Sequence, residues 1–209
     1  IGGFRIPPRG GNLGILPFAL DEQSALNMLA NAGDDDFTWD EDTETISSGG
    51  DGLTESNLFP QETGAPGNRG TVDIGSSNNS TDDIARQITE GVSPADLSYH
   101  NGELKLNADG ILLLNGDTGI SAGVKDELAS IIGKPRCIPI FSGVTENGNN
   151  ATYTIVGFVG IRILEVKLSG TLSKKKVVIQ PATIVMSGTI PGTGYTVSDH
   201  IYSPVWLVR

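Results

Sequence analysis

The sequence from Gly67 to Gly91, GNRGTVDIGSSNNSTDDIARQITEG, places a glycine-rich turn, a strand and a helix in one short passage. Thr71–Ile74 alternates as a half-buried strand does. Ser80 or Thr81 is a natural helix N-cap, and the two aspartates that follow complement the helix dipole. Gly91 ends the helix. The passage therefore predicts a strand followed by a capped helix, and tight-turn geometry explains the glycines before them.

A second passage with the same layout ends at Gly133. The apolar segments Leu104–Leu106 and Ile111–Leu114 flank Asn107–Gly110, whose Asp-Gly pair tolerates positive φ, and this pattern predicts a hairpin. Ser121 then caps another helix, which ends at Gly133 with a proline shortly beyond. The expected buried face of that helix is Val124, Leu128, Ile131 and Ile132.

The chain beyond Gly133 is strongly β in character. Its strand-like segments are residues 136–141, 153–168, 176–184 and 201–208. Gly157 and Gly160 fall inside the second segment and indicate a bulge or a sharp bend. With 28 Gly and 11 Pro to join short strands, the sequence predicts an α+β, β-rich fold: a sandwich or barrel-like sheet with about three short capped helices.

Residues 1–209 are expected to form a single domain, with residues 1–11 as an extended N-terminal arm. Asp21 is the predicted N-cap of a first helix, and Gly33 its left-handed C-terminal residue. Residues 34–56 form an acidic loop excursion, because Asp34–Glu55 carries nine carboxylates and no basic residue. Such a segment is typical of a solvated loop, here with a short hairpin anchored by Trp39.

The formal net charge of -11 argues against nucleic acid and anionic membranes as partners, since both attract clustered Lys and Arg. Cys137 is the single cysteine, which excludes an internal disulfide and favours a small buried side chain. The chain begins at Ile1 and contains no apolar run near 18 residues. We expect it to be a piece of a longer precursor whose targeting segment lies upstream.

No catalytic pattern stands out. His100 and His200 lack a suggestive partner, a Gly-x-Ser-x-Gly elbow is absent, and no zinc-ligand spacing occurs. Calcium is the better cofactor candidate, because hard cations prefer clustered oxygen ligands. Its weak candidate ligands are Asp34, Asp35, Asp36, Asp40 and Asp42. Their spacing does not fit an EF-hand loop, so a solvated acidic loop is the favoured interpretation, with no cofactor.

The order of several short motifs resembles the extracytoplasmic region of TadE/TadG-like Flp pilus-assembly proteins, especially a planctomycete branch. These motifs are Leu16–Leu20, Pro66–Gly70, Ile84–Gly91, Gly116–Gly119, Gly119–Leu128, Pro135–Phe141, Val156–Gly160 and Tyr202–Arg209. The resemblance implies an exported, extracellular or cell-surface domain, with a membrane anchor upstream in the precursor. The family offers no catalytic residues to transfer.

Three functions are weighed from the sequence. The first is a non-enzymatic structural or assembly component of an extracellular appendage (pilus- or filament-like) or the cell envelope. It would self-associate through strand edges and terminal arms, and its partners would be further copies of itself or other envelope or pilus subunits. The second is a calcium-assisted module that binds a surface glycan or peptidoglycan through Trp39, the acidic loop and Gly67–Gly70. The third, a hydrolase with scattered carboxylates, has the weakest support.

Overall fold

The computed structural model describes residues 1–58, 69–75, 80–118, 120–145, 151–171, 174–192 and 197–204. Its centre is a closed five-stranded barrel, so the prediction of an α+β, β-rich fold is confirmed in its barrel form. The barrel strands are β2 (Phe18–Asp21), β6 (Arg69–Val72), β8 (Leu112–Thr118), β10 (Ala151–Lys167) and β9 (Pro135–Thr145). Taken in that order each strand pairs with the next, and β9 pairs with β2 to close the ring. The β2–β9 pair is parallel and the other pairs are antiparallel.

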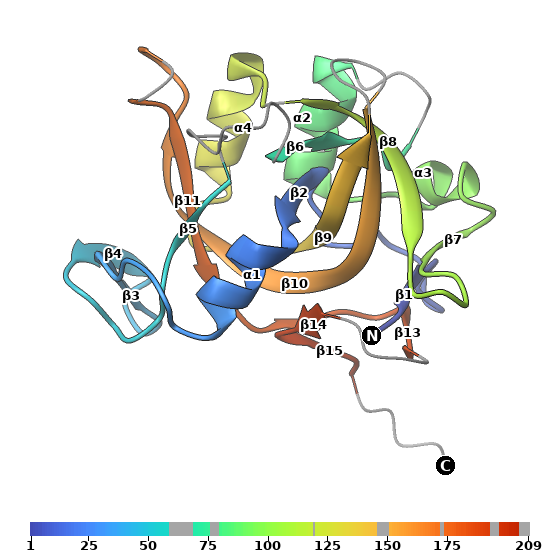
Figure 1. The fold of residues 1–209 in the computed structure, drawn as a ribbon, viewed down its shortest axis with the longest axis horizontal. Coiled ribbons are helices and arrows are strands. Elements are labelled where there is room, and N and C mark those ends of the chain that lie inside the picture. The colour runs from blue at the N-terminus through green and yellow to red at the C-terminus, as the bar shows by residue number, and fades with distance from the viewer. Residues whose placement is uncertain are drawn as a thin grey trace.

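The remaining elements surround this barrel (Figure 1). The other strands are β1 (Gly3–Arg5), β3 (Phe37–Asp40), β4 (Thr45–Ser48), β5 (Ser56–Asn57), β7 (Glu103–Lys105), β11 (Lys176–Pro181), β12 (Ile184–Val185), β13 (Thr189–Ile190), β14 (Val197–Asp199) and β15 (Ile201–Tyr202). The helices are α1 (Glu22–Leu29), α2 (Thr81–Glu90), α3 (Pro94–Ser98), the short 3₁₀ helix η1 (Ala122–Val124) and α4 (Lys125–Ser130). Helices α2 and α4 pack against each other at the end of the barrel away from β14 and β15 (Figure 1).

The long strand β10 connects the two halves of the core. Its side chains project to both faces of the sheet, and the register shifts near Ile155 change which positions face which side. Ile161 and Ile163 join the cluster under α1, α2 and α4, whereas Tyr153 and Phe158 join the cluster that reaches β1. The pairing of β10 with β9 shifts register between Ile155 and Gly157, which confirms the bulge or bend predicted at Gly157.

Two glycines make room for an aromatic ring in the barrel. Gly70 in β6 and Gly116 in β8 both lie against Tyr153, and a Cβ on either glycine would overlap backbone of the neighbouring strand. Tyr153 is buried, donates a hydrogen bond to the carbonyl of Asp117 and meets Phe141 edge to face. For Gly70, close packing rather than the predicted tight turn is therefore the reason for glycine. Gly64–Gly67 lies outside the described residues.

The predicted helix caps are confirmed. Asp21, Ser80 and Ser121 each accept a hydrogen bond from a backbone N–H in the first turn of α1, α2 and η1 respectively. Gly91 is the C-cap of α2, and Gly133 has a φ of 80°. The sequence interpretation missed α3, although Ser93 and Asp96 form a capping box at its start.

The end predicted for the first helix is wrong. Helix α1 ends at Leu29, and Asn31 rather than Gly33 has the left-handed φ of 52°. A Cβ on Gly33 would lie 2.7 Å from Thr54 Cγ2, so close approach of the chain explains this glycine. Of the apolar residues Leu26, Met28 and Leu29, which the sequence predicts to form the buried stripe of this helix, Met28 is buried but Leu26 is exposed.

The predicted hairpin around Asn107–Gly110 forms its turn but not its ladder. Gly110 has a φ of 77°, and the Asn107 N–H donates to the Ile111 carbonyl. However, β7 pairs with β1, whereas β8 pairs with β6 and β10. The strands separate because each finds a partner that is distant in sequence.

The N-terminal arm is extended, as predicted, but its first residues belong to the fold. Strand β1 lies between β7 and β13 in a three-stranded sheet. Phe4 is fully buried and meets Phe158 edge to face. Gly3–Arg5 therefore already has a strand partner on each side within the chain.

Within the described ranges, no helix combines the length and apolar character that crossing a membrane requires.

Candidate functional site

The acidic segment contains the predicted hairpin. Strands β3 and β4 pair with Trp39 opposite Ile46, and the hairpin projects from the side of the barrel (Figure 1). Trp39 contacts two parts of the chain that lie far from it in sequence. The guanidinium carbon of Arg162 lies 4.4 Å from the Trp39 ring centroid, and Gly133 closely approaches the far edge of the ring. Trp39 therefore anchors the hairpin, as the sequence predicted.

Most carboxylates of the segment with a described contact bind backbone N–H groups of the segment itself. Asp35 accepts from Asp51 and Gly52, and Glu55 accepts from Asp36 and Phe37. Burial, reinforced by nearby aspartates, raises the pKa of Glu55 even though these hydrogen bonds oppose the shift. The acidic loop is thus organised by its own carboxylates and is not simply solvated.

The calcium candidates do not converge on one point. Asp40 accepts hydrogen bonds from Asp42 and Thr43 in the hairpin turn, and those from Thr43 chiefly lower the pKa of Asp40. Asp34 and Asp36 instead line a shallow pocket of about 260 Å³ beside Lys176. Across the described ranges, no group of three or more His, Cys, Asp or Glu side chains is placed to hold a metal ion.

Arg162 is the centre of a second polar site, under the hairpin. It lies on β10 and is only 5% exposed. Its Nη2 donates to Oε1 of Glu41 at 2.6 Å, across 121 residues of sequence. The hydrogen bond from Arg162 chiefly holds the pKa of Glu41 below its ordinary value. A buried arginine that loses its partner is left as an uncompensated charge, which is costly. The pair therefore holds the hairpin, which carries Glu41, against the barrel, which carries Arg162.

A pocket of about 490 Å³ opens beside Arg162. Its lining is Trp39, Glu41, Asp51, Leu53, Pro135, Arg162, Gln180, Pro181, Ala182, Thr183 and His200. The acidic segment supplies Trp39, Glu41 and Asp51, and the sheet supplies Arg162 and Gln180. This is the convergence of a few polar groups with apolar walls that small-ligand sites have.

Three buried atoms in this pocket wall lack a protein partner among the described residues, and one of them is Nε1 of Trp39. Among the described residues, neither Nε of Arg162 nor Oε1 of Gln180 has a hydrogen-bond partner. Gln180 is 1% exposed and lies directly opposite Arg162 in the β10–β11 ladder. Its amide nitrogen makes a long contact of 3.4 Å with Asp51. Because buried polar groups are normally paired, the donors on Trp39 and Arg162 and the acceptor on Gln180 are left for a ligand group or water to satisfy.

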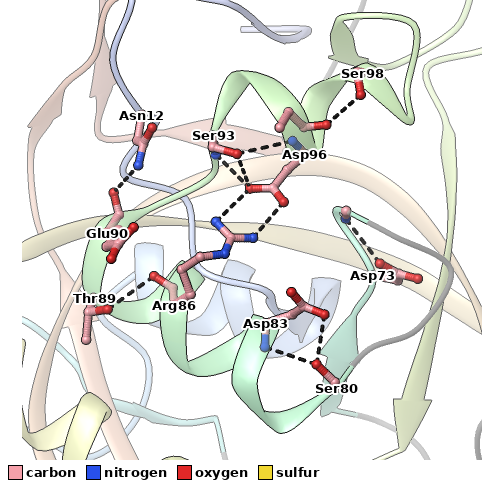
Figure 2. A network of polar contacts seen from close by, with 12 residues as sticks. Asn12, Asp73, Ser80, Asp83, Arg86, Thr89, Glu90, Ser93, Asp96 and Ser98 are labelled. Carbon is pink, nitrogen blue, oxygen red and sulfur yellow. Dashed lines mark hydrogen bonds and ion pairs between the residues drawn. The ribbon is translucent and has the colours of Figure 1, made fainter.

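A second polar network, around α2 and α3, has the opposite character. Figure 2 shows Arg86 of α2 reaching Asp96 of α3 with both of its terminal nitrogens. Asp96 also accepts from the backbone and the hydroxyl of Ser93. Burial alone would raise the pKa of Asp96, but the hydrogen bonds from Arg86 and Ser93 outweigh it and lower the pKa. The carboxylate is fully engaged, so this network ties two helices together.

The residues singled out for nucleophilic or acid–base chemistry are dispersed. His100 is largely buried near Asp73, and burial lowers its pKa. His200 lies in the pocket beside Arg162, far along the chain from His100. Cys137 is fully buried, as predicted, and burial raises the pKa of its thiol well above the ordinary value. These positions do not assemble a nucleophile with a base.

Sequence reasoning overlooked Arg162 and Gln180. Each is a polar residue within an apolar strand run. Arg162 lies between Ile161 and Ile163, and Gln180 follows Val177–Ile179. A polar residue in a buried strand indicates a hydrogen-bonding partner on that face of the sheet. This is the sequence signal by which Arg162 and Gln180 are recognisable.

Comparison with known proteins identified no relatives. No family model matches the chain, and no curated protein or solved structure matches it.

Proposed function

We propose that this chain is a non-enzymatic structural or assembly component of an extracellular appendage or the cell envelope. Its anchor would lie upstream in the precursor, and it would associate with further copies of itself. The ordered motifs that resemble TadE/TadG-like proteins support this proposal. So does the use of its charged groups: the ion pairs and carboxylate contacts described above fasten one element of the chain to another.

The observation that carries the proposal is a pair of exposed apolar side chains, Val185 on β12 and Tyr202 on β15. Val185 is 63% exposed and Tyr202 is 54% exposed. They lie opposite each other in the parallel β12–β15 ladder, so they face the same side. Within the described residues these strands form a two-stranded sheet, which leaves each with an edge that has no strand partner there. Unpaired edges with apolar side chains favour strand addition.

Charge also favours this surface for self-association. The chain has a net charge of -11, so two copies repel each other over most of their surfaces. The sequence from Pro181 to Ser198, which includes β12, contains no Asp, Glu, Lys or Arg. A contact made there brings apolar and uncharged groups together and avoids most of that repulsion. The same surface lies next to Tyr202, where the C-terminal arm expected to contact a second copy begins. Residues 205–209 of that arm are outside the described residues.

The test is the mass distribution of the purified chain as its concentration increases, measured by sedimentation velocity and negative-stain microscopy. We expect association of the native chain and about ten-fold weaker association for Val185→Glu, because a buried charge opposes the contact. Leu113→Glu is the matched control, since Leu113 is 59% exposed but lies on β8. A native chain that stays monomeric at every concentration, or a Leu113→Glu chain that loses association equally, contradicts the proposal.

A further inference from the structure

The pocket beside Arg162 is not used by the proposed assembly surface, and its chemistry selects a type of ligand. Two of its three unpaired buried atoms belong to residues directly opposite each other in the β10–β11 ladder, Arg162 Nε as a donor and Gln180 Oε1 as an acceptor, and the third is the donor Nε1 of Trp39. A hydroxyl group both donates and accepts hydrogen bonds. One hydroxyl placed between Arg162 and Gln180 would satisfy both atoms, which a carboxylate or an ammonium group alone cannot do.

Charge in the pocket disfavours ionic ligands of either sign. An anion would lie close to Glu41 and Asp51, and Nη2 of Arg162 is already paired with Glu41. A cation would meet the guanidinium of Arg162, which already covers the Trp39 ring. Asp51 is also engaged, because it accepts hydrogen bonds from backbone N–H groups of Trp39 and Leu53. An uncharged ligand avoids both penalties.

Apart from Thr183 and His200, the remaining walls are apolar. Leu53, Pro135, Pro181 and Ala182 line the pocket with carbon atoms, and Trp39 adds an aromatic edge. Such walls pack against the C–H faces of a ring that carries hydroxyl groups on its rim. The volume of about 490 Å³ is within the range of pockets that hold small organic ligands.

We propose that this pocket binds an uncharged pyranose unit of a surface glycan, with one sugar hydroxyl bridging Arg162 and Gln180. The sugar ring lies against the apolar wall, and the exposed carboxylate of Glu41 accepts a hydrogen bond from a further hydroxyl group. Recognition depends on these side chains and requires no calcium ion. The pocket adjoins β12, since Pro181, Ala182 and Thr183 line it, but Gln180→Met changes only the pocket and Val185→Glu changes only the assembly surface, so the two proposals are tested separately.

The experiment is a titration of the whole chain with the methyl glycosides of glucose, galactose, mannose and N-acetylglucosamine. Binding is followed by calorimetry and by the indole N–H signal of Trp39 in NMR spectra, assigned with a Trp206→Phe variant. At least one glycoside is expected to bind with a dissociation constant of about 1 mM or tighter. Affinity is expected to be equal with calcium and with a chelator.

Gln180→Met keeps the side-chain volume, removes the acceptor and is expected to weaken binding about ten-fold. Gln87→Met is the matched control, because Gln87 is equally buried with an unpartnered Oε1 but lies on α2, away from the pocket. Thr183→Trp, at an exposed lining position, blocks the pocket without altering the core and should abolish binding. The proposal is overturned if no glycoside binds, if glycerol binds equally well, if calcium is required, or if Gln180→Met and Thr183→Trp leave affinity unchanged.

Discussion

The hydroxyl group of Tyr153 occupies the space that a side chain at Gly70 would need. Gly70 lies in β6 and Tyr153 in β10, and the two strands are not neighbours in the barrel, so the ring spans its interior. The backbone carbonyl of Asp117 closes the same space from β8. The barrel is therefore packed around Tyr153, and burial raises the pKa of that phenol to about 12.

Gly70→Ala is expected to destabilise the fold by about 2 kcal/mol, because overpacked cores must shift side chains or backbone. Gly143→Ala is the control: Gly143 also lies in a barrel strand, but a Cβ there meets nothing within 4 Å. Urea unfolding measures both. Adding Tyr153→Phe to Gly70→Ala should recover part of the loss, since it removes the overlapping hydroxyl. Equal stability of the two alanine variants would contradict this packing argument.

The Arg86–Asp96 pair predicts a second stability effect. Asp96→Asn removes the charge that accepts from Arg86 and Ser93, and it should cost about 2 kcal/mol, since hydrogen bonds to charged groups contribute about this much. Asp82→Asn serves as the control, because Asp82 is exposed on α2, the helix that carries Arg86. Thermal and urea unfolding of the two variants provide the comparison. A loss of stability no larger than that of Asp82→Asn would show that the pair is dispensable.

The sequence predicted best those features that a few neighbouring residues determine. Ser80, Asp21 and Ser121 cap helices because each side chain reaches an N–H only two or three residues away. The barrel could be predicted only as a class, because strand pairing depends on distant partners. Leu104 lies opposite Phe4 in the β1–β7 pair, and no local pattern around Leu104 indicates that partner.

The candidate site shows the same limit. Trp39 and the acidic hairpin were predicted from local composition. Arg162 and Gln180 were not, because their significance depends on Glu41 and Asp51, which are more than a hundred residues earlier in the chain. Conversely, the acidic cluster that suggested a calcium site is used within the hairpin, since backbone N–H groups close in space compete for the same carboxylates.

His100 should make stability depend on pH. Burial lowers its pKa below the ordinary value of 6.5, partly offset by Asp73 and by a hydrogen bond with the Ile74 backbone. The unfolded chain therefore binds this proton more readily than the folded chain. The contribution of neutral His100 is complete above the ordinary pKa and is lost as the pH falls from about 6.5 toward the lower folded value.

The loss attributable to His100 should not exceed about 1.4 kcal/mol per pH unit, the limit for one titrating group. Urea unfolding at about pH 7.5 and about pH 5.5 measures it, and this window lies above the ordinary range of most carboxylates. His100→Gln should reduce the difference between the two conditions. An identical pH dependence in the native chain and the variant would mean that His100 titrates alike in both states.

The acidic hairpin should be insensitive to calcium. An ion that binds only the folded state raises the melting temperature by mass action, so a genuine site would reveal itself as a difference between calcium and chelator. We expect no difference, because Asp35, Asp40 and Glu55 already bind backbone N–H groups. Differential scanning calorimetry in the two buffers is the measurement, and a clear upward shift with calcium would instead support the metal-assisted interpretation.

Two substitutions separate these interpretations further. Asp35 accepts hydrogen bonds from the backbones of Asp51 and Gly52, so Asp35→Asn should lower stability by about 1 kcal/mol whether or not calcium is present. Asp42 is exposed, and Asp42→Asn should be nearly neutral in both buffers. If the carboxylates instead formed a metal site, each substitution would act mainly by reducing a calcium-induced gain in melting temperature, and the chelated variants would resemble the chelated native chain.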